Sequence, residues 1–431
     1  MAEWSNWAGN QRAQPARVVR PADLDEVSKA VTGAAEDGLR VRAVGSGHSF
    51  TAAALTDGVL LRMDQLTRLR SADTSTGLVT VEAGMTLHRL CRHLADLGLA
   101  LTNMGDIDVQ TVSGAISTGT HGTGRASASI ADQLHGMELV LADGSVTHCS
   151  PDRNPELFEA AKVSLGALGV VTAVTFQTEP AYLLHAVEEP VAVDEVLATF
   201  DELADGNEHF EFYWFPHSTV ALTKCNNRTD GPARPVNRVK DWVDDMLVAN
   251  HVFGAACRLG RRFPRVTPRI NRLSGTLLSR RDYVDRSDRV YTSPRRVRFT
   301  EMEYAVPRGA VVEVVRELRD LIDRNGWRIS FPIEVRVAPP DPAWLSTAHD
   351  RHTAYVAIHR FVGTGLDEYF ELAEEIFVAA GGRPHWGKLH TRDAGYLAER
   401  YPRFGDFAAL RDELDPDRRF TNTYLDRVLG S

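Results

Sequence analysis

Several features are scarce or missing in this 431-residue chain. No run of about 18 apolar residues is present, so no membrane span is predicted. The first residues lack the basic and apolar regions of a secretory signal. Lys and Arg are outnumbered by Asp and Glu, 49 to 58, and a net charge of −9 argues against nucleic-acid binding. We therefore expect a cytoplasmic globular protein.

Cysteine is also scarce. The four cysteines are widely separated and form no C-x-x-C pair, so a disulfide framework or a zinc site is not expected. Isolated cysteines of this kind are usually buried and reduced. They are Cys91, Cys149, Cys225 and Cys257.

The length of the chain and a change in its residue pattern indicate two domains. A chain of this length exceeds what one compact core usually holds. Strand-like and helix-like segments alternate up to residue 177, including a strand-like stretch at Leu101–Met104. After Glu179-Pro180 the pattern changes, with an aromatic cluster and later an arginine-dense region. The second half then reads as a separate α+β unit.

A glycine-rich loop follows a predicted strand near the N-terminus. Residues 39–44 read as a strand that runs into residues 45–50 (GSGHSF), and another strand follows at 59–61. A Rossmann site needs G-x-G-x-x-G opening directly into a helix, but Phe50 stands at the third glycine. Rossmann-type NAD binding is therefore disfavoured. The loop can still bind phosphates through a concave nest of backbone N–H groups.

A second segment, residues 112–124 (VSGAISTGTHGTG), is dense in small residues. Small residues let a backbone approach an extended ligand closely, and this segment also supplies hydroxyl and amide donors. The alternative is an ordinary loop between core elements.

The segment 333–337 (IEVRV) alternates strictly between apolar and charged residues. On a strand this alternation puts Glu334 and Arg336 on one face. A carboxylate beside a guanidinium can bind a polyhydroxylated substrate, because Glu334 accepts from hydroxyls and Arg336 donates to carbonyl or ring oxygens. The alternative is a cross-strand or surface ion pair.

Two further segments of the second half have unusual composition. The aromatic run 213–217 (YWFPH) is interpreted as second-domain core. The region Arg258–Arg298 holds 13 arginines, with apolar residues near its start. It is either a solvated face interleaved with aspartates or a surface for peripheral membrane contact or acceptor docking.

Taken in order, these segments resemble the vanillyl-alcohol-oxidase-type flavoprotein family, in its sugar-1,4-lactone oxidase and alditol oxidase branch. The resemblance covers nearly the whole chain and implies an α+β two-domain flavoprotein. It rests on residues 44–50, 114–124, 166–171, 334–336 and 385–388. The implied units are an FAD-binding domain (1–178), a substrate (cap) domain built on an antiparallel sheet (179–385) and a C-terminal segment (386–431) that returns to the FAD-binding domain.

The resemblance implies FAD bound covalently through His48. A neutral imidazole is a competent nucleophile near neutral pH, and the small neighbours of His48 leave room for a flavin ring. The alternative is an exposed or capping histidine. The implied cofactor-binding residues are Val44, Gly45, Ser46, Gly47, His48, Ser49, Gly105, Asp106, Ser113, Gly114, Ser117, Thr120, His121, Gly122, Gly169 and Val170.

Gly105 and Asp106 are placed beside the isoalloxazine ring by the same resemblance. Glycine leaves more room near the carbon that reacts with oxygen, which makes O2 use plausible. An electron-acceptor protein or a quinone remains open. Asp106 stands where some alditol oxidases have serine, which favours a lactone substrate.

The implied catalytic residues are Glu334, Arg336, Lys388 and His359. Lys388, in residues 385–388 (HWGK), resembles the family's active-site lysine and would stabilise developing negative charge; a role as base is left open. His359 matches a histidine that contacts substrate in the alditol branch, and its alternative is an ordinary strand-face histidine. His385 and His390 have poor zinc spacing, so no metal is predicted.

The expected function is oxidation of a CH–OH group of a gulono-, galactono- or arabinono-1,4-lactone by hydride transfer to FAD, with O2 or another acceptor. An alditol oxidase acting on open-chain polyols is the close alternative. Two alternatives belong to other functional classes: a non-catalytic flavin-binding electron relay, and a two-domain binding protein without flavin.

Overall fold

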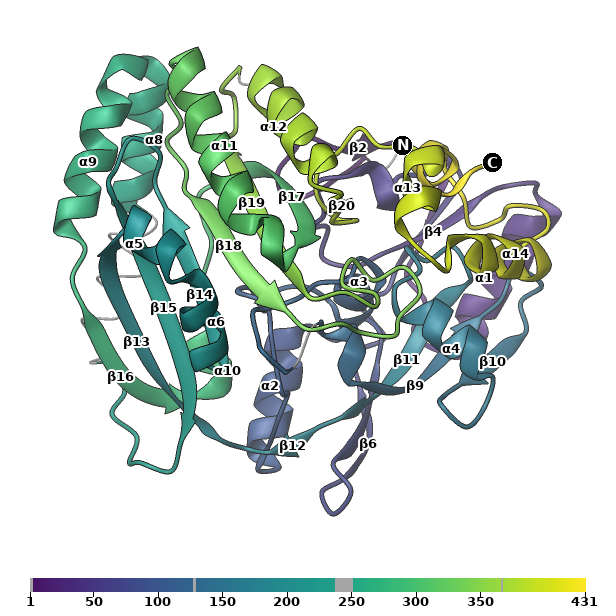
Figure 1. Cartoon of the computed structure of the whole chain (residues 1–431). Helices are drawn as coiled ribbons and strands as arrows, with labels where there is room; N and C mark the ends of the chain where they lie inside the picture. Colours follow the sequence, from purple (N-terminus) through teal and green to yellow (C-terminus); the bar gives the residue numbers. More distant parts are fainter. Residues whose placement is uncertain (1–2, 127–128, 237–250, 366) are drawn as a thin grey trace.

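The computed structural model describes residues 3–126, 129–236, 251–365 and 367–431. The elements form two bodies: the first half of the chain with its C-terminal helices, and a large antiparallel sheet with its own helices (Figure 1). Both chain ends lie on the first body. None of the helices in these residues is long and apolar enough to cross a membrane.

A small parallel sheet carries the first glycine-rich loop. Its order is β3 (Arg17–Val19), β5 (Val59–Arg62) and β4 (Val41–Val44), and α1 (Leu24–Glu36) packs against it. The buried face of α1 packs with apolar side chains of β4 and β5 in one cluster. β4 ends at Val44, so the loop begins where the sheet ends.

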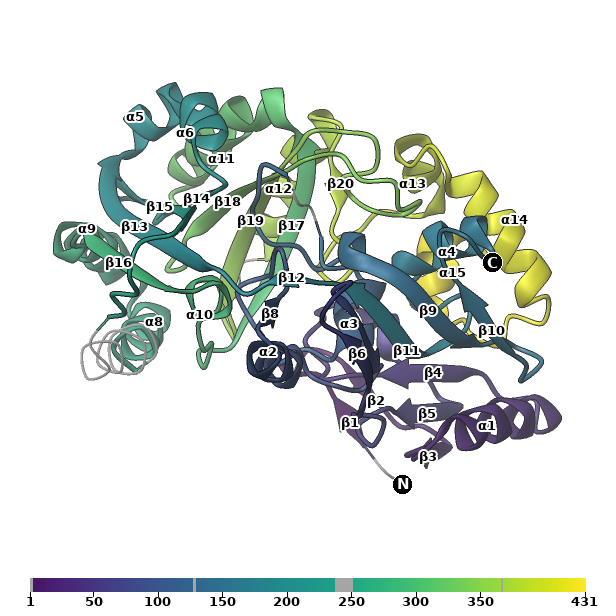
Figure 2. The same cartoon turned by 90° about the horizontal axis from the view of Figure 1, so that it is seen from below.

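Beside it lies a five-stranded antiparallel sheet (Figure 2). Its order is β10 (Val146–Cys149), β9 (Leu134–Val140), β11 (Val170–Gln177), β7 (Leu78–Glu82) and β6 (Leu69–Asp73). The associated helices are α2 (Leu87–Asp96), α3 (Val112–Ser117) and α4 (Pro155–Lys162). A short hairpin of β1 (Trp4–Ser5) and β2 (Arg12–Ala13) precedes both sheets.

The strand predicted at residues 101–104 is wrong. The structure has only the two-residue β8 (Leu99–Ala100) there, paired with β12 (Glu179–Pro180). Beyond it, side chains take the backbone hydrogen bonds that a ladder would use. The amide N–H of Thr102 donates to the Gln133 side chain, and Gln133 Nε2 donates to the Asn103 carbonyl. These bonds keep the segment irregular.

An eight-stranded sheet forms the second body, and its pairings are all antiparallel. The order is β16 (Arg281–Arg286), β13 (Leu183–Ala192), β15 (Val220–Thr229), β14 (His209–Trp214), β18 (Ile333–Ala338), β19 (Thr353–Phe361), β17 (Phe299–Pro307) and β20 (Arg383–Pro384). This confirms the predicted two-domain α+β architecture with an antiparallel cap sheet.

The two faces of this sheet differ in character, because successive side chains alternate between them. One face is apolar and packs with α5 (Val193–Ala198), α6 (Phe200–Gly206), α11 (Val311–Asn325) and α12 (Asp367–Ala379) in a single core. The other carries charged side chains of β14, β18, β19 and β17, which we call the polar sheet face. It is defined by Glu211, Glu334, Arg336, His359, Glu301 and Glu303.

The C-terminal helices α13 (Ala394–Arg400), α14 (Phe404–Leu414) and α15 (Thr423–Leu429) pack into the same core as the five-stranded sheet. Asn422, which caps α15, donates to the Ala52 and Leu55 carbonyls, and buried Arg42 donates to the Phe420 carbonyl. The chain end therefore closes over the glycine-rich loop. The domain boundaries at 178 and 385 stay a prediction.

Candidate functional site

A cleft of about 890 Å³, partly open to solvent, lies between the two glycine-rich segments. Of the sequence-predicted cofactor residues, ten line it: Val44, Gly45, Ser46, Gly47, His48, Ser49, Ser113, Gly114, Ser117 and Gly169. Six others do not: Gly105, Asp106, Thr120, His121, Gly122 and Val170. Arg42, Thr111 and Leu165 also line the cleft and carried no recognised sequence signal.

The two segments touch at Gly45. A Cβ on Gly45 would lie 2.0 Å from Thr111 Oγ1, so only glycine fits there without a shift. Thr111 in turn caps α3 by accepting from the Gly114 N–H. Gly47 has φ +70, a conformation that glycine adopts without strain. The glycines therefore set both the spacing and the curvature of the cleft wall.

We expect Gly45→Ala to lose most of any cofactor held in this cleft. The added methyl group would push Thr111 out of its capping position and separate the two segments, at a cost of about 1–3 kcal/mol. Gly33→Ala is the matched control, because a Cβ there meets nothing within 4 Å. The flavin-to-protein absorbance ratio of the purified variants measures the effect; equal ratios would contradict this account of the cleft.

His48 lines the cleft and lies close enough to Lys388 to feel its charge. Burial, followed by the charge of Lys388, lowers the pKa of His48 to about 4, so the imidazole is neutral at neutral pH. Its ring stacks on Trp7 at 5.3 Å between centroids. The following residues are tied to the 385–388 segment: the Phe50 N–H donates to the Gly387 carbonyl, and Thr51 donates to the Trp386 carbonyl.

The polar sheet face brings Lys388 and His359 together through Glu301. Lys388 forms an ion pair with Glu301, whose other oxygen lies 3.6 Å from His359 Nε2. Burial alone would lower the pKa of Lys388, but Glu301 and Glu303 outweigh burial and raise it, so the side chain is an ammonium. Burial lowers the pKa of His359, whose Nδ1 donates to the Pro332 carbonyl. Glu301 was missed by sequence reasoning.

Arg336 is shared by three carboxylates. Its Nε donates to Glu211 at 2.9 Å, it pairs with Glu334, and its Nη2 lies 3.7 Å from Asp106. The sheet geometry explains the first two contacts, because Glu211 stands opposite Arg336 on the neighbouring strand and Glu334 lies two residues from Arg336 on the same strand face. Asp106 enters from the N-terminal domain, so the network joins the two bodies.

The carboxylates compete for this guanidinium, and their pKa values move apart. Burial raises the pKa of Glu334 to about 8, helped by Asp106 and Glu211 and opposed by Arg336. Burial would also raise the pKa of Glu211 and of Asp106, but Arg336, acting with Lys224 on Glu211 and with Arg295 on Asp106, lowers both. Glu334 is therefore the carboxyl that holds a proton at neutral pH.

Two sequence interpretations need correction here. The aromatic run is only partly core: Trp214 is buried in the apolar cluster, but alternation turns Tyr213 toward the Glu211 and Glu334 carboxylates, whose charges, after burial, raise its pKa well above the usual range. The arginine-dense region is not uniformly a surface. Arg295 donates to Asp106 at 2.9 Å and so belongs to the charged network.

Gly105 packs closely against the second glycine-rich segment. A Cβ on Gly105 would lie 3.2 Å from the His121 carbonyl and 3.3 Å from Thr120 Cγ2, so a larger residue would be tight at this position. Thr120 is held there by Gln110, which donates to its hydroxyl. The use of O2 stays a prediction.

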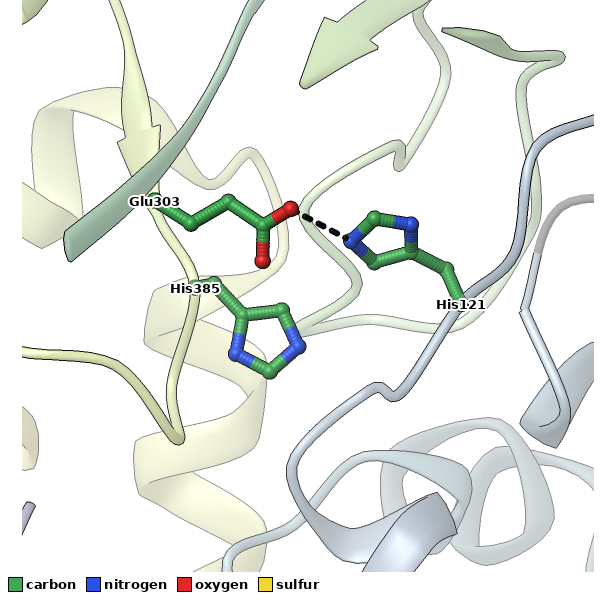
Figure 3. A group of neighbouring side chains, drawn as sticks. All are labelled: His121, Glu303 and His385. Atoms are coloured by element: carbon green, nitrogen blue, oxygen red, sulfur yellow. Dashed lines mark ion pairs between the residues drawn. The ribbon is translucent and has the colours of Figure 1, made fainter. Parts of the chain in front are cut away.

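His121, Glu303 and His385 form a buried group beneath the polar sheet face (Figure 3). The dashed line in Figure 3 joins His121 Nε2 to Glu303 at 3.4 Å. His121 Nδ1 donates to the Gly122 carbonyl, which leaves Nε2 facing Glu303. His385 Nδ1 accepts from the Gly387 N–H, and the same ring also hydrogen-bonds the Gly119 backbone. Both nitrogens of His385 thus have backbone partners.

Comparison with protein families gives two matches. Residues 174–428 match the model described as D-arabinono-1,4-lactone oxidase, and residues 15–150 match an FAD binding domain. Between them the matches include the first glycine-rich loop and the whole polar sheet face.

Similar proteins extend over the full chain. An L-gulono-1,4-lactone dehydrogenase of Mycobacterium tuberculosis is 45% identical over 427 residues, covering 99% of each chain. An L-gulonolactone oxidase of Bos taurus and an alditol oxidase of a Streptomyces species are each 32% identical, covering 99% of this chain and 98% of the relative. Among solved structures, a solvent-stable cholesterol oxidase matches with a TM-score of 0.82 at 20% identity, covering 100% of this chain and 97% of the other. At that identity the last match shows a shared fold only.

Proposed function

Because the chain belongs to the D-arabinono-1,4-lactone oxidase family and carries an FAD-binding domain, we propose that it oxidises a CH–OH group of a sugar 1,4-lactone with FAD held covalently by His48. The proposed substrates are lactones of the gulono, galactono or arabinono type. One observation carries the proposal. His48, which is neutral, lines the glycine-rich cleft, and the buried polar groups that include Lys388, Glu334 and Arg336 lie beside it.

The cleft residues fit FAD. Gly45, Gly47 and the residues around them offer backbone N–H groups that can cradle a pyrophosphate, and Ser117 adds a hydroxyl donor. A neutral His48 imidazole can act as the nucleophile that forms the covalent link.

The side chains of the polar sheet face supply the rest of the chemistry. The bound flavin provides an acceptor for the hydrogen removed from the substrate carbon, together with its electron pair. Lys388, kept as an ammonium by Glu301, stabilises negative charge as it develops. Protonated Glu334 and Arg336 donate to the lactone carbonyl and ring oxygens and fix the substrate's orientation.

The test of the proposed function is a steady-state comparison of substrates. Purified protein is assayed with gulono-, galactono- and arabinono-1,4-lactones and with xylitol and sorbitol, following both reduction of an artificial dye and consumption of oxygen. We expect turnover of at least one lactone. We also expect dye reduction to exceed oxygen consumption, because the relative at 45% identity is named a dehydrogenase. Turnover of the open-chain polyols alone would instead support an alditol oxidase, the activity named in a relative at 32% identity.

The proton on Glu334 predicts a pH dependence of substrate binding. As pH rises through about 8, Glu334 ionises, the site loses a donor, and a third negative charge gathers around Arg336. Between pH 8 and pH 10 we expect the KM for the lactone to rise in the wild type, approaching about tenfold per pH unit. In Glu334→Gln the amide keeps a donor and cannot ionise, so KM should stay flat over this range. Parallel KM profiles in the two proteins would refute this role.

A further inference from the structure

Two helices, α8 (Phe253–Arg262) and α9 (Thr267–Leu277), lie at the edge of the second body, away from the N-terminal sheets in both views (Figures 1 and 2). Residues 251–281 contain no aspartate or glutamate, although the whole chain carries a net charge of −9. The same stretch contains eight arginines: Arg258, Arg261, Arg262, Arg265, Arg269, Arg272, Arg280 and Arg281.

Exposed apolar side chains gather on these helices. Six large hydrophobic side chains are exposed among the described residues, and four of them lie here. They are Val252 (53% exposed), Leu259 (47%), Phe263 (53%) and Leu273 (59%). Val252, Leu259 and Phe263 are seven and four residues apart, which is the spacing of one helical face. Such a cluster is unusual on a surface that water alone covers.

The arginines of this surface also stand apart from the others in the arginine-dense region. Farther along the chain, Arg286, Arg289 and Arg295 pair with aspartates. Within the described residues, no carboxylate lies within ion-pair distance of Arg258, Arg262, Arg265 or Arg269, all of which are exposed. Among the residues that the structure describes, no acidic side chain therefore neutralises these four charges.

We propose that the α8–α9 surface, defined by residues 252–273, docks on an anionic lipid bilayer. Unneutralised arginines are attracted to lipid phosphates, and apolar side chains that project between them can enter the acyl boundary. Both views place the two helices at an outer edge of the second body, which suits a planar partner. This inference does not depend on the substrate or the catalytic roles proposed above.

Vesicle flotation of the flavin-loaded enzyme tests the proposal. We expect the wild type to float with phosphatidylglycerol vesicles and not with phosphatidylcholine vesicles, and to release at high salt. A triple charge reversal (Arg262→Glu, Arg265→Glu, Arg269→Glu) and a triple polar variant (Leu259→Ser, Phe263→Ser, Leu273→Ser) should each lower the bound fraction more than tenfold. Both should keep wild-type flavin absorbance and turnover, which shows that they remain folded.

A matched control distinguishes lipid binding through this surface from a general effect of net charge. Arg92→Glu, Arg153→Glu and Arg324→Glu together change the charge by the same amount at exposed positions elsewhere and should leave flotation intact. Equal loss in the control, equal binding to both lipids, or no binding to either would overturn the proposal. A dimer in light scattering that only the α8–α9 variants abolish would assign the surface to a second copy and would also overturn it.

Discussion

Replacing His48 with alanine is expected to abolish the covalent attachment of flavin completely. His48 is the histidine that lines the glycine-rich cleft, and its imidazole is neutral at neutral pH. Acid precipitation followed by a denaturing gel under ultraviolet light should give a fluorescent band for the wild type and none for His48→Ala. Flavin should still enter the cleft without a covalent bond, since the backbone and the serine hydroxyls that line it are unchanged.

His359→Ala is the matched control for this experiment. It removes an imidazole from the polar sheet face without touching the cleft lining, so its fluorescent band should persist while substrate turnover falls. Mass spectrometry of the peptide that contains His48 gives an independent measurement. An unmodified peptide from the wild type, or a fluorescent band that survives in His48→Ala, would show that the linkage lies elsewhere or does not exist.

Replacing Arg336 with alanine is expected to have the largest effect on catalysis. Arg336 is the shared partner of Glu211, Glu334 and Asp106, and it is 8% exposed. Removing one partner of a buried ion pair costs about 3–5 kcal/mol, because the remaining charges lose their compensation. If that cost falls on the substrate complex, kcat/KM for the lactone drops by about 10²–10⁴-fold. Thermal unfolding with and without lactone shows how much of the cost falls on stability.

Arg20→Ala provides the surface comparison. Arg20 makes two hydrogen bonds to Asp64 and both side chains are substantially exposed, so its loss should change kcat/KM and stability very little. Arg336→Lys asks a second question, because lysine keeps the charge but cannot contact three carboxylates with a planar fork. A kcat/KM for Arg336→Ala close to that of Arg20→Ala would show that the network is not part of the substrate site.

The sequence predicted the parts of this protein that depend on local geometry. The strands expected at residues 39–44 and 59–61 are present as β4 and β5, and the alternation in residues 333–337 does put Glu334 and Arg336 on one strand face. In both cases the pattern and the structure that it predicts lie within the same few residues.

The residues that sequence reasoning missed pair with residues that lie far away along the chain. Glu211 lies 125 positions from Arg336, Glu301 lies 87 from Lys388, and Arg295 lies 189 from Asp106. Each is an ordinary charged residue in an ordinary local pattern. These residues meet their partners only through the sheet register and the contact between the two bodies. The local pattern of apolar and polar residues in the sequence carries no information about either.

The sequence alone therefore determined the family, the α+β architecture, the cofactor class and a first set of candidate residues, since these follow from motifs in chain order. The tertiary structure alone decided the protonation states. Burial leaves His48 neutral and leaves one proton on Glu334 among three carboxylates that share Arg336, whereas Glu301 and Glu303 keep Lys388 charged against the effect of burial. The reason is that a pKa depends on solvent exclusion and on charges a few ångströms away, and folding alone assembles both.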